Sequence, residues 1–122
     1  MNEIRYKRIY YAPEETDGFR VLVDRLWPRG VKKEAAHIAL WAKEIAPSAE
    51  LRKWFSHEQE RFEAFSRLYT AELNANPAAE GFVATVCEEL THGNVTLLYA
   101  ARDVACNHAV VLRDWLRKEK SK

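Results

Sequence analysis

A chain of 122 residues, 48% hydrophobic and 30% charged, fits one domain over residues 1–122 and can bury a core without disulfides or metals. Its 19 basic and 18 acidic residues give a formal net charge of +1, which argues against binding nucleic acid through a large basic face. The N-terminus lacks the apolar stretch of a signal peptide, and the longest nearly uncharged run, Asn94–Ala101, is too short to span a membrane, so we expect a cytoplasmic protein.

Two strands are predicted in the N-terminal third. Ile4–Tyr11 mixes apolar and basic residues, as a strand with one wet face does, and Phe19–Asp24 is mostly apolar and β-branched. A loop over Ala12–Gly18 connects them and closes with the turn pair Asp17-Gly18. Trp27-Pro28-Arg29-Gly30 ends the second strand, because proline cannot continue a ladder.

The middle of the chain is predicted to be helical after one irregular stretch. That stretch holds a short helical turn at Lys32–Ala36 and a short strand near Ile38–Ala42. A first helix begins after Ser48 as N-cap and places Leu51, Trp54 and Phe55 on one face. A second runs from Glu58 to Leu73, and a third is opened by Asn76-Pro77 and stops at Gly93.

The C-terminal third contributes one strand and one helix. Val95–Ala100 is a continuous apolar run, typical of a strand covered on both faces, and Asn107–Lys118 carries an apolar stripe of helical spacing. Strands at both ends of the chain with helices between them predict a single α/β domain, a small, mostly parallel sheet flanked by helices. We expect Phe19–Asp24 and Val95–Ala100 to be parallel neighbours, with their carboxyl ends on one edge.

Two polar clusters follow these two strands, Asp24–Gly30 and Arg102–His108. Ligands of open parallel sheets bind outside the carboxyl ends of the strands, so we expect a small-molecule site there. Its expected ligand is an anion bearing phosphate, for example a nucleotide. The candidate catalytic residues are Asp24, as base or orienting group, and His108, as proton carrier; the candidate ligand-binding residues are Arg25, Arg29, Arg102, Asn107, Trp27 and Lys43.

Each candidate also has a structural interpretation. Asp24 and Arg25 can form a buried ion pair that closes a strand, and Asn107 can be only a helix N-cap. His108 can be a half-buried histidine with satisfied hydrogen bonds. Cys106 lies near a helix start, where a thiolate can be activated, but no base or second cysteine accompanies it. Neither Cys106 nor Cys87 has metal-ligand or disulfide spacing, so both are predicted to be free thiols.

Four segments carry a family resemblance. Arg20–Gly30, Trp41–Ser48, Leu51–His57 and Thr96–Asp103 resemble the signature of the YeaO-like branch of a bacterial and archaeal family of unknown function, in order and over nearly the whole chain. The resemblance implies a small α/β sheet protein and favours the two clusters as the site, without implying a reaction. It adds Trp41, Ser48, Arg52 and His57 to the residues of interest, with Lys43 and Arg52 as rim contacts.

The chain departs from the wider family at the second cluster. Broader relatives pair an Asp-Val-Arg strand end with a Cys-His-Arg near a helix start, whereas the matching positions here are Asp24-Arg25 and Asn107-His108-Ala109. The missing cysteine counts against a thiol mechanism, and Cys106 stands one position early. Phe62 replaces an expected tryptophan.

Three functions remain open from the sequence. The first is a site for an anionic small molecule, which the protein either binds or converts; the sequence indicates no cofactor for it. The second is a non-catalytic regulatory or interaction module that uses the same pocket. The third is nucleic-acid binding through Arg25, Arg29, Lys32 and Lys33, which the net charge disfavours. No phosphate-binding glycine loop, zinc-binding motif or nucleophile elbow occurs.

Overall fold

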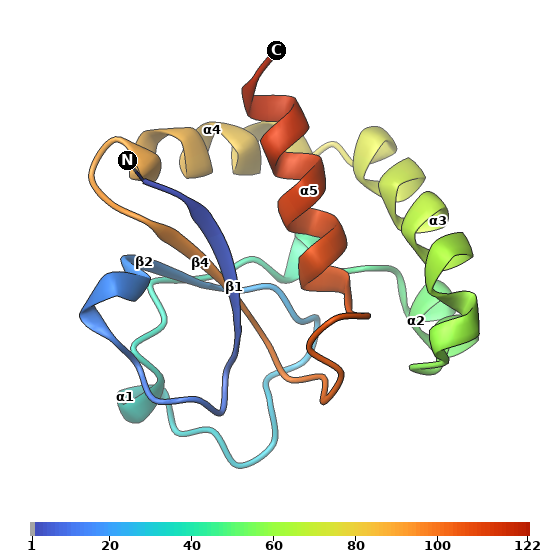
Figure 1. The fold of residues 1–122 in the computed structure, drawn as a ribbon, viewed down its shortest axis with the longest axis horizontal. Helices are drawn as coiled ribbons and strands as arrows, with labels where there is room; N and C mark the ends of the chain where they lie inside the picture. The colour runs from blue at the N-terminus through green and yellow to red at the C-terminus, as the bar shows by residue number, and fades with distance from the viewer. Residues whose placement is uncertain (1) are drawn as a thin grey trace.

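The computed structural model describes residues 2–122, and these surround one four-stranded, all-parallel sheet (Figure 1). The strands are β1 (Ile4–Arg8), β2 (Phe19–Leu22), β3 (Leu40–Trp41) and β4 (Val95–Tyr99), in the order β1-β4-β2-β3. The last strand of the chain therefore lies in the middle of the sheet, with Val95 opposite both Ile4 and Phe19. Every residue of β4 is buried, as expected for a parallel strand covered on both faces. The predicted fold class and the pairing of the two strands are confirmed.

Five helices within residues 2–122 complete the domain. They are α1 (Lys33–Ala36), α2 (Ala49–Phe55), α3 (Phe62–Ala75), α4 (Ala79–Leu90) and α5 (His108–Lys120), with short 3-10 turns at Glu15–Asp17, Lys43–Ile45 and Gln59–Arg61. In Figure 1, α3, α4 and α5 gather at the top and right, whereas α1 lies at the lower left among long loops. In the described part of the chain, no helix is long and apolar enough to cross a membrane.

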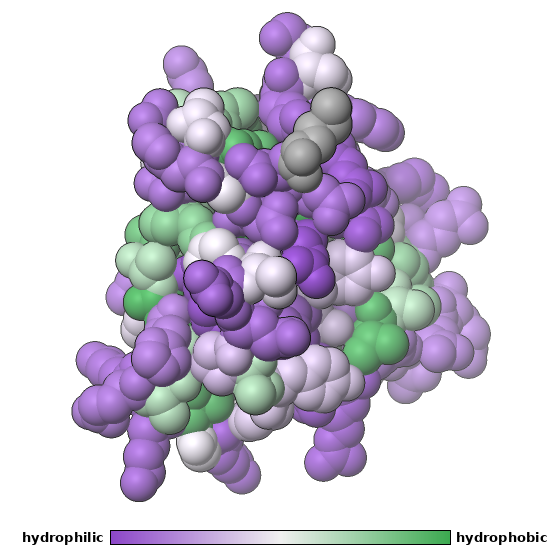
Figure 2. Space-filling model, turned by 60° about the vertical axis from the view of Figure 1, so that its left-hand side comes forward, coloured by the Kyte–Doolittle hydropathy of each residue, from purple (hydrophilic) through white to green (hydrophobic). Residues whose placement is uncertain are grey.

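The two faces of the sheet are covered differently. On one face, Val21, Leu97 and Tyr99 pack with the apolar sides of α2, α3, α4 and α5 in the larger core cluster. On the other face, Leu22 and Leu98 pack with the irregular segment before β3. Alternation along β2 and β4 produces this division, because successive side chains point to opposite faces of a strand. Burial of these side chains leaves a mostly hydrophilic exterior on the face drawn in Figure 2, where hydrophobic residues form small, separate patches.

A buried ionic cluster lies near the start of β2. The Asp17 carboxylate accepts hydrogen bonds from Lys7 Nζ at 3.1 Å and Arg20 Nη1 at 2.5 Å, and the Arg20 guanidinium also donates to the Ala36 carbonyl. Burial alone would raise the pKa of Asp17, but the hydrogen bonds from the Glu14 backbone, Lys7 and Arg20 outweigh it and leave that pKa lowered. The next residue, Gly18, has φ of 64° and lies so close to Asn94 that a Cβ atom would stand 2.1 Å from the Asn94 carbonyl oxygen.

Several predicted boundaries shift by a few residues. β1 ends at Arg8 rather than Tyr11, because the Tyr11 N–H turns back to the Arg8 carbonyl. β2 ends at Leu22, although the Val23 N–H still reaches the Leu98 carbonyl. The predicted start of α4 at Asn76-Pro77 is wrong by two residues, since Asn76 forms a turn ahead of the helix.

The predicted apolar face of α2 is partly wrong. Leu51 and Phe55 are buried, but Trp54 is 42% exposed, with the Arg61 guanidinium 5.5 Å from its ring centroid. The Ser48 hydroxyl accepts the Leu51 N–H, which confirms the predicted N-cap. α1 and β3 occur within the predicted Lys32–Ala36 and Ile38–Ala42.

Candidate functional site

A cleft of about 630 Å³ lies at the carboxyl edge of the sheet. Its walls are the segment after β2, the loop before α2, the end of α2 and the loop between β4 and α5. The lining residues include Asp24–Pro28, Ala46, Pro47, Arg52, Phe55, His57, Phe65, residues 100–103, Asn107 and His108. The two predicted polar clusters therefore converge on one space, which we call the cleft.

Asp24 and His108 form the polar centre of the cleft. Asp24 Oδ2 accepts the Ala100 N–H at 3.0 Å, and Asp24 Oδ1 lies 2.9 Å from His108 Nε2. The same imidazole nitrogen is 3.1 Å from the Val23 carbonyl oxygen, and the ring is oriented for this hydrogen bond. Asp24 Oδ1 is enclosed and receives no well-directed hydrogen bond. The partner of Asp24 is thus His108, and the expected alternative of an Asp24–Arg25 ion pair is wrong.

Three arginines line the cleft. Arg25 is half-buried and donates through Nε and Nη2 to the carbonyls of Ala46 and Pro47, at 3.1 to 3.3 Å. Its Nη1 makes no hydrogen bond within residues 2–122, so one end of the guanidinium is available to a ligand. Arg52 and Arg102 are exposed side chains on the same lining. The cleft therefore has a cationic rim over a wall of apolar residues, which include Leu26, Trp27, Phe55 and Phe65.

Asn107 and Trp27 line the cleft but also serve the fold. Asn107 is buried, and its Oδ1 caps α5 by accepting the N–H groups of Ala109 and Val110. The Trp27 indole donates to the Val31 carbonyl at 2.7 Å and packs edge-on against Trp41, with ring centroids 5.4 Å apart. These contacts within the fold account for the polar atoms of both side chains, as the N-cap interpretation of Asn107 expects.

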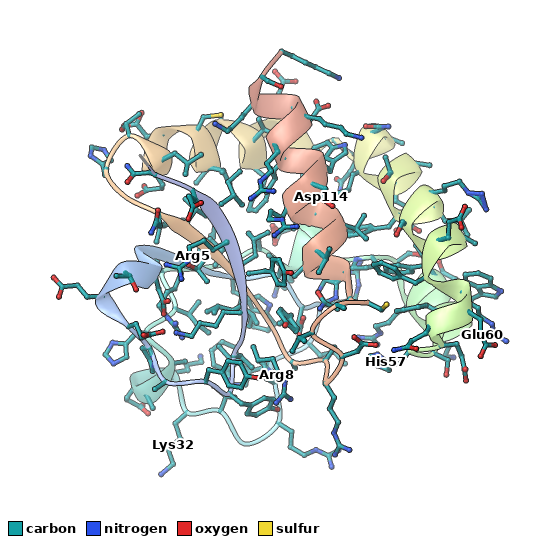
Figure 3. The ribbon with its side chains drawn as sticks, in the orientation of Figure 1. Arg5, Arg8, Lys32, His57, Glu60 and Asp114 are labelled. Carbon is teal, nitrogen blue, oxygen red and sulfur yellow. The ribbon has the colours of Figure 1, made fainter. Side chains whose placement is uncertain are left out.

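Other predicted residues lie outside the cleft lining. Arg29 is exposed, and Lys43 places its ammonium 4.8 Å from the centroid of the Trp41 ring. Lys32 extends away from the body at the lower edge of Figure 3, far from His57. Of the four basic residues proposed for nucleic acid, Arg25 lines the cleft, whereas Arg29, Lys32 and Lys33 do not. Cys106 also lies outside it; burial, together with the Asp103 carboxylate, raises the pKa of its thiol.

Two supporting contacts were not predicted, although the family resemblance singled out Trp41, and Asp103 lies in the second polar cluster. The Trp41 indole N–H donates to the Asp24 carbonyl at 2.8 Å and so fixes the backbone of the cleft's central acid. The Asp103 carboxylate accepts N–H groups from Ala105, Cys106 and the Gln59 side chain, which joins the loop before α5 to the α2–α3 connection. The Gln59 hydrogen bond and then those of Cys106 and Ala105 hold the pKa of Asp103 below its ordinary value. Neither contact could be found without the three-dimensional pairing of distant segments.

The rim of the cleft contains strained backbone. Ser56 and His57, at the end of α2, have φ values of 47° and 57°, in a region that side chains other than glycine rarely adopt. Figure 3 shows His57 at the lower end of α3, beside the loop that leads into α5. Strain of this kind, about 1–3 kcal/mol per residue, clusters at functional sites.

The family assignment follows from residues 3–122, which match the family model described as "Inactive DUF488-N3 subclade". The chain belongs to the DUF488 family. This assignment confirms the resemblance seen in the sequence.

Curated relatives cover nearly the same length as this DUF488 chain. It is 45% identical over 114 residues to "Uncharacterized protein YeaO" of Escherichia coli (strain K12), covering 93% of this chain and 96% of the relative. It is 40% identical over 113 residues to "Uncharacterized protein Rv3073c" of Mycobacterium tuberculosis (strain ATCC 25618 / H37Rv), covering 93% and 92%. No solved structure matches it significantly.

Proposed function

We propose that the cleft binds a small organic anion, with a phosphate or carboxylate group and an apolar or planar body, and releases it unchanged. A nucleotide is one member of this class. The observation that carries the proposal is the combination of three arginine side chains with an apolar wall in one cleft of about 630 Å³. Arginine presents forked N–H donors that match phosphate and carboxylate oxygens.

The charges of the cleft favour an anion bound at its rim. Arg25, Arg52 and Arg102 contribute three positive charges, and Asp24 and Asp103 contribute two negative ones. Both carboxylates already accept hydrogen bonds from the protein: Asp24 from Ala100, and Asp103 from Ala105, Cys106 and Gln59. The free N–H donors of the arginines therefore remain for the ligand. Apolar side chains beside them favour a ligand with a hydrophobic portion over inorganic phosphate.

Binding without turnover fits the small choice of nucleophilic side chains at the cleft. Cys106 lies outside the cleft lining and carries a thiol whose pKa is raised by burial, so it is a poor thiolate nucleophile. Among the described residues, the cleft lining contains no serine, threonine or lysine side chain that could take its place. The description of the subclade as inactive points the same way.

Thermal melting in the presence of chosen anions tests the proposal. The panel is phosphate, ribose 5-phosphate, the common nucleoside monophosphates, phenyl phosphate, benzoate and naphthalene-1-sulfonate. A ligand at a hundredfold its Kd stabilises the fold by about 2.7 kcal/mol, a shift of several degrees. We expect aromatic anions to raise the Tm and inorganic phosphate to have little effect.

A matched pair of variants locates the binding. Arg102→Gln removes a cleft arginine that has no hydrogen bond within residues 2–122, so its fold should be unaffected while the Tm shift falls. Arg29→Gln removes an exposed arginine outside the lining and should leave the shift intact. The absence of any shift across the panel, or equal losses in the two variants, would contradict anion binding in the cleft.

A further inference from the structure

We propose that anion binding in the cleft is coupled to uptake of one proton from solvent by His108 at Nδ1. This inference rests on the function proposed above and adds a chemical role for one named atom. His108 then acts as a binding residue whose charge rises by one when the anion arrives. The ligand class narrows accordingly to anions that keep an acceptor oxygen for an N–H donor at the floor of the cleft.

The surroundings of Nε2 determine which ring nitrogen carries the hydrogen in the free protein. Nε2 of His108 lies 3.1 Å from the Val23 carbonyl oxygen and 2.9 Å from Asp24 Oδ1. Both neighbours are acceptors and neither can donate when Asp24 is a carboxylate. A bare nitrogen lone pair facing two oxygens would be repelled, so Nε2 must hold a hydrogen. The neutral ring is therefore the Nε2–H form, with its lone pair on Nδ1.

Nδ1 of His108 is the open end of the ring. Nδ1 makes no hydrogen bond within residues 2–122. Among the enclosed side-chain nitrogen and oxygen atoms of these residues, only Asp24 Oδ1 lacks a hydrogen-bond partner, so Nδ1 is not one of the enclosed atoms. Nδ1 is therefore not sealed inside the core. Since the His108 side chain, 16% exposed, lines the cleft, we infer that Nδ1 faces it. A lone pair at this place repels an anion, whereas an N–H attracts one.

Asp24 stabilises the protonated ring. The carboxylate oxygen 2.9 Å from Nε2 offsets the positive charge that the ring gains. An anion at the rim adds a second negative neighbour on the opposite side. By linkage, a ligand that favours the protonated ring must draw the proton onto it, and protonation must strengthen ligand binding by the same factor.

The other groups around His108 keep their charge near neutral pH. Arginines 25, 52 and 102 stay cationic, and the lowered pKa of Asp103 keeps it anionic. Tyr69 of α3, whose ring centroid is 6.5 Å from that of His108, donates to the Ile45 carbonyl, and burial holds its pKa well above the ordinary value, so it stays neutral. His57 on the rim is the other histidine of the lining, and it serves as the control.

Nitrogen NMR of histidine-labelled protein without ligand tests the first step. At pH 8 the His108 ring should show the Nε2–H tautomer, identified by the chemical shifts of its two nitrogens. The Nδ1–H tautomer at His108 would overturn the inference, whatever the ligand experiments give. Asp24→Asn is informative here: the amide oxygen must face the Ala100 N–H, so the NH₂ group faces Nε2 and the tautomer preference should weaken.

Calorimetry with naphthalene-1-sulfonate tests the coupling. This probe stays anionic at every pH used, so any pH dependence belongs to the protein. We expect the affinity to rise roughly fivefold or more from pH 8 to pH 5.5, and the binding enthalpy at pH 7 to depend on the buffer's ionisation enthalpy, which shows proton uptake. His108→Gln keeps a donor toward Val23 but cannot titrate, and should abolish both effects. His57→Asn, which suits the left-handed backbone, should leave both in place.

The outcomes separate this inference from the function on which it rests. Binding that is equally tight at pH 5.5 and 8, with no buffer dependence, overturns proton coupling and leaves anion binding standing. Proton coupling that vanishes in His57→Asn and persists in His108→Gln would show that His57 takes up the proton, and this result also overturns the inference. Absence of binding at every pH, by naphthalene-1-sulfonate and by the phosphates and carboxylates of the melting panel, overturns both. If His108→Gln does not fold, the nitrogen shifts of His108 in wild-type protein with and without probe decide the matter, since Nδ1 must gain a hydrogen on binding.

Discussion

Replacing Asp17 by asparagine should destabilise the fold by about 3 kcal/mol at pH 7, the lower end of the range for breaking a buried ion pair. The Asp17 side chain is 2% exposed and accepts hydrogen bonds from Lys7, Arg20 and the Glu14 N–H. An asparagine keeps one acceptor but turns an NH₂ group toward cations. Arg20, itself 4% exposed, is left as a buried charge without a counter-charge.

Urea unfolding followed by circular dichroism measures this loss, and Glu14→Gln is the matched control. Glu14 pairs with the same Lys7 ammonium at 2.8 Å, but its side chain is 64% exposed, so its removal should cost less than about 1 kcal/mol. The lowered pKa of Asp17 determines how the free energy of unfolding depends on pH. The stabilisation by the Asp17 carboxylate is complete above its pKa in the unfolded chain, about 3.9, and is lost as the pH falls through its lower pKa in the folded protein. The gap between wild type and Asp17→Asn should therefore narrow below about pH 4. Equal losses in the two variants, or a gap that widens in acid, would refute the reasoning.

Two further predictions concern backbone packing and thiol chemistry. Gly18→Ala should cost about 3 kcal/mol or more in thermal melts, because its Cβ would stand 2.1 Å from the Asn94 carbonyl oxygen at a φ of 64°, whereas Gly93→Ala meets open space and should be nearly neutral. A Gly18→Ala variant that melts like the wild type would contradict the close approach of these two loops. Cys106 should react with iodoacetamide at pH 7.5 more slowly than free cysteine, since burial and the Asp103 charge raise the pKa of its thiol, and Asp103→Asn should speed the reaction; mass spectrometry of the labelled peptide measures both rates.

The fold was predictable where local pattern and layer rules agree. The buried run Val95–Tyr99 and the apolar stripe of α5 predict a central strand and a helix packed on it, and both occur. Boundaries failed where a local turn hydrogen bond decides the end of an element, as at Tyr11 and Asn76. The exposure of Trp54 could not be predicted either, because helical spacing places it on the apolar face while the packing of Arg61 lets it lie outside.

The candidate site was predictable in position and not in its internal contacts. Parallel pairing of β2 and β4 brings the two polar clusters together, a consequence of topology that sequence order alone implies. Which acid meets which base depends on side-chain direction. Asp24 points along the sheet edge to Ala100 and His108, and Arg25, the next residue, points away to the carbonyls of Ala46 and Pro47. The chain bends at Arg25, just after the end of β2, so the two adjacent side chains diverge and the expected Asp24–Arg25 pair does not form.

The Asp24–His108 pair has a structural role in a cleft whose described lining contains no serine, threonine, lysine or cysteine. Asp24 joins the end of β2 to β4 through the Ala100 N–H, and His108 joins the first residue of α5 to β2 through the Val23 carbonyl. The pair therefore fixes three elements around the cleft whether or not a reaction takes place there. A purely structural role would require only these hydrogen bonds, which a non-titrating His108→Gln can retain in part. A purely structural role does not explain why Nδ1 of His108 is left without a hydrogen bond. Proton uptake on anion binding is therefore the property that distinguishes a ligand-binding role of the pair from a purely structural one.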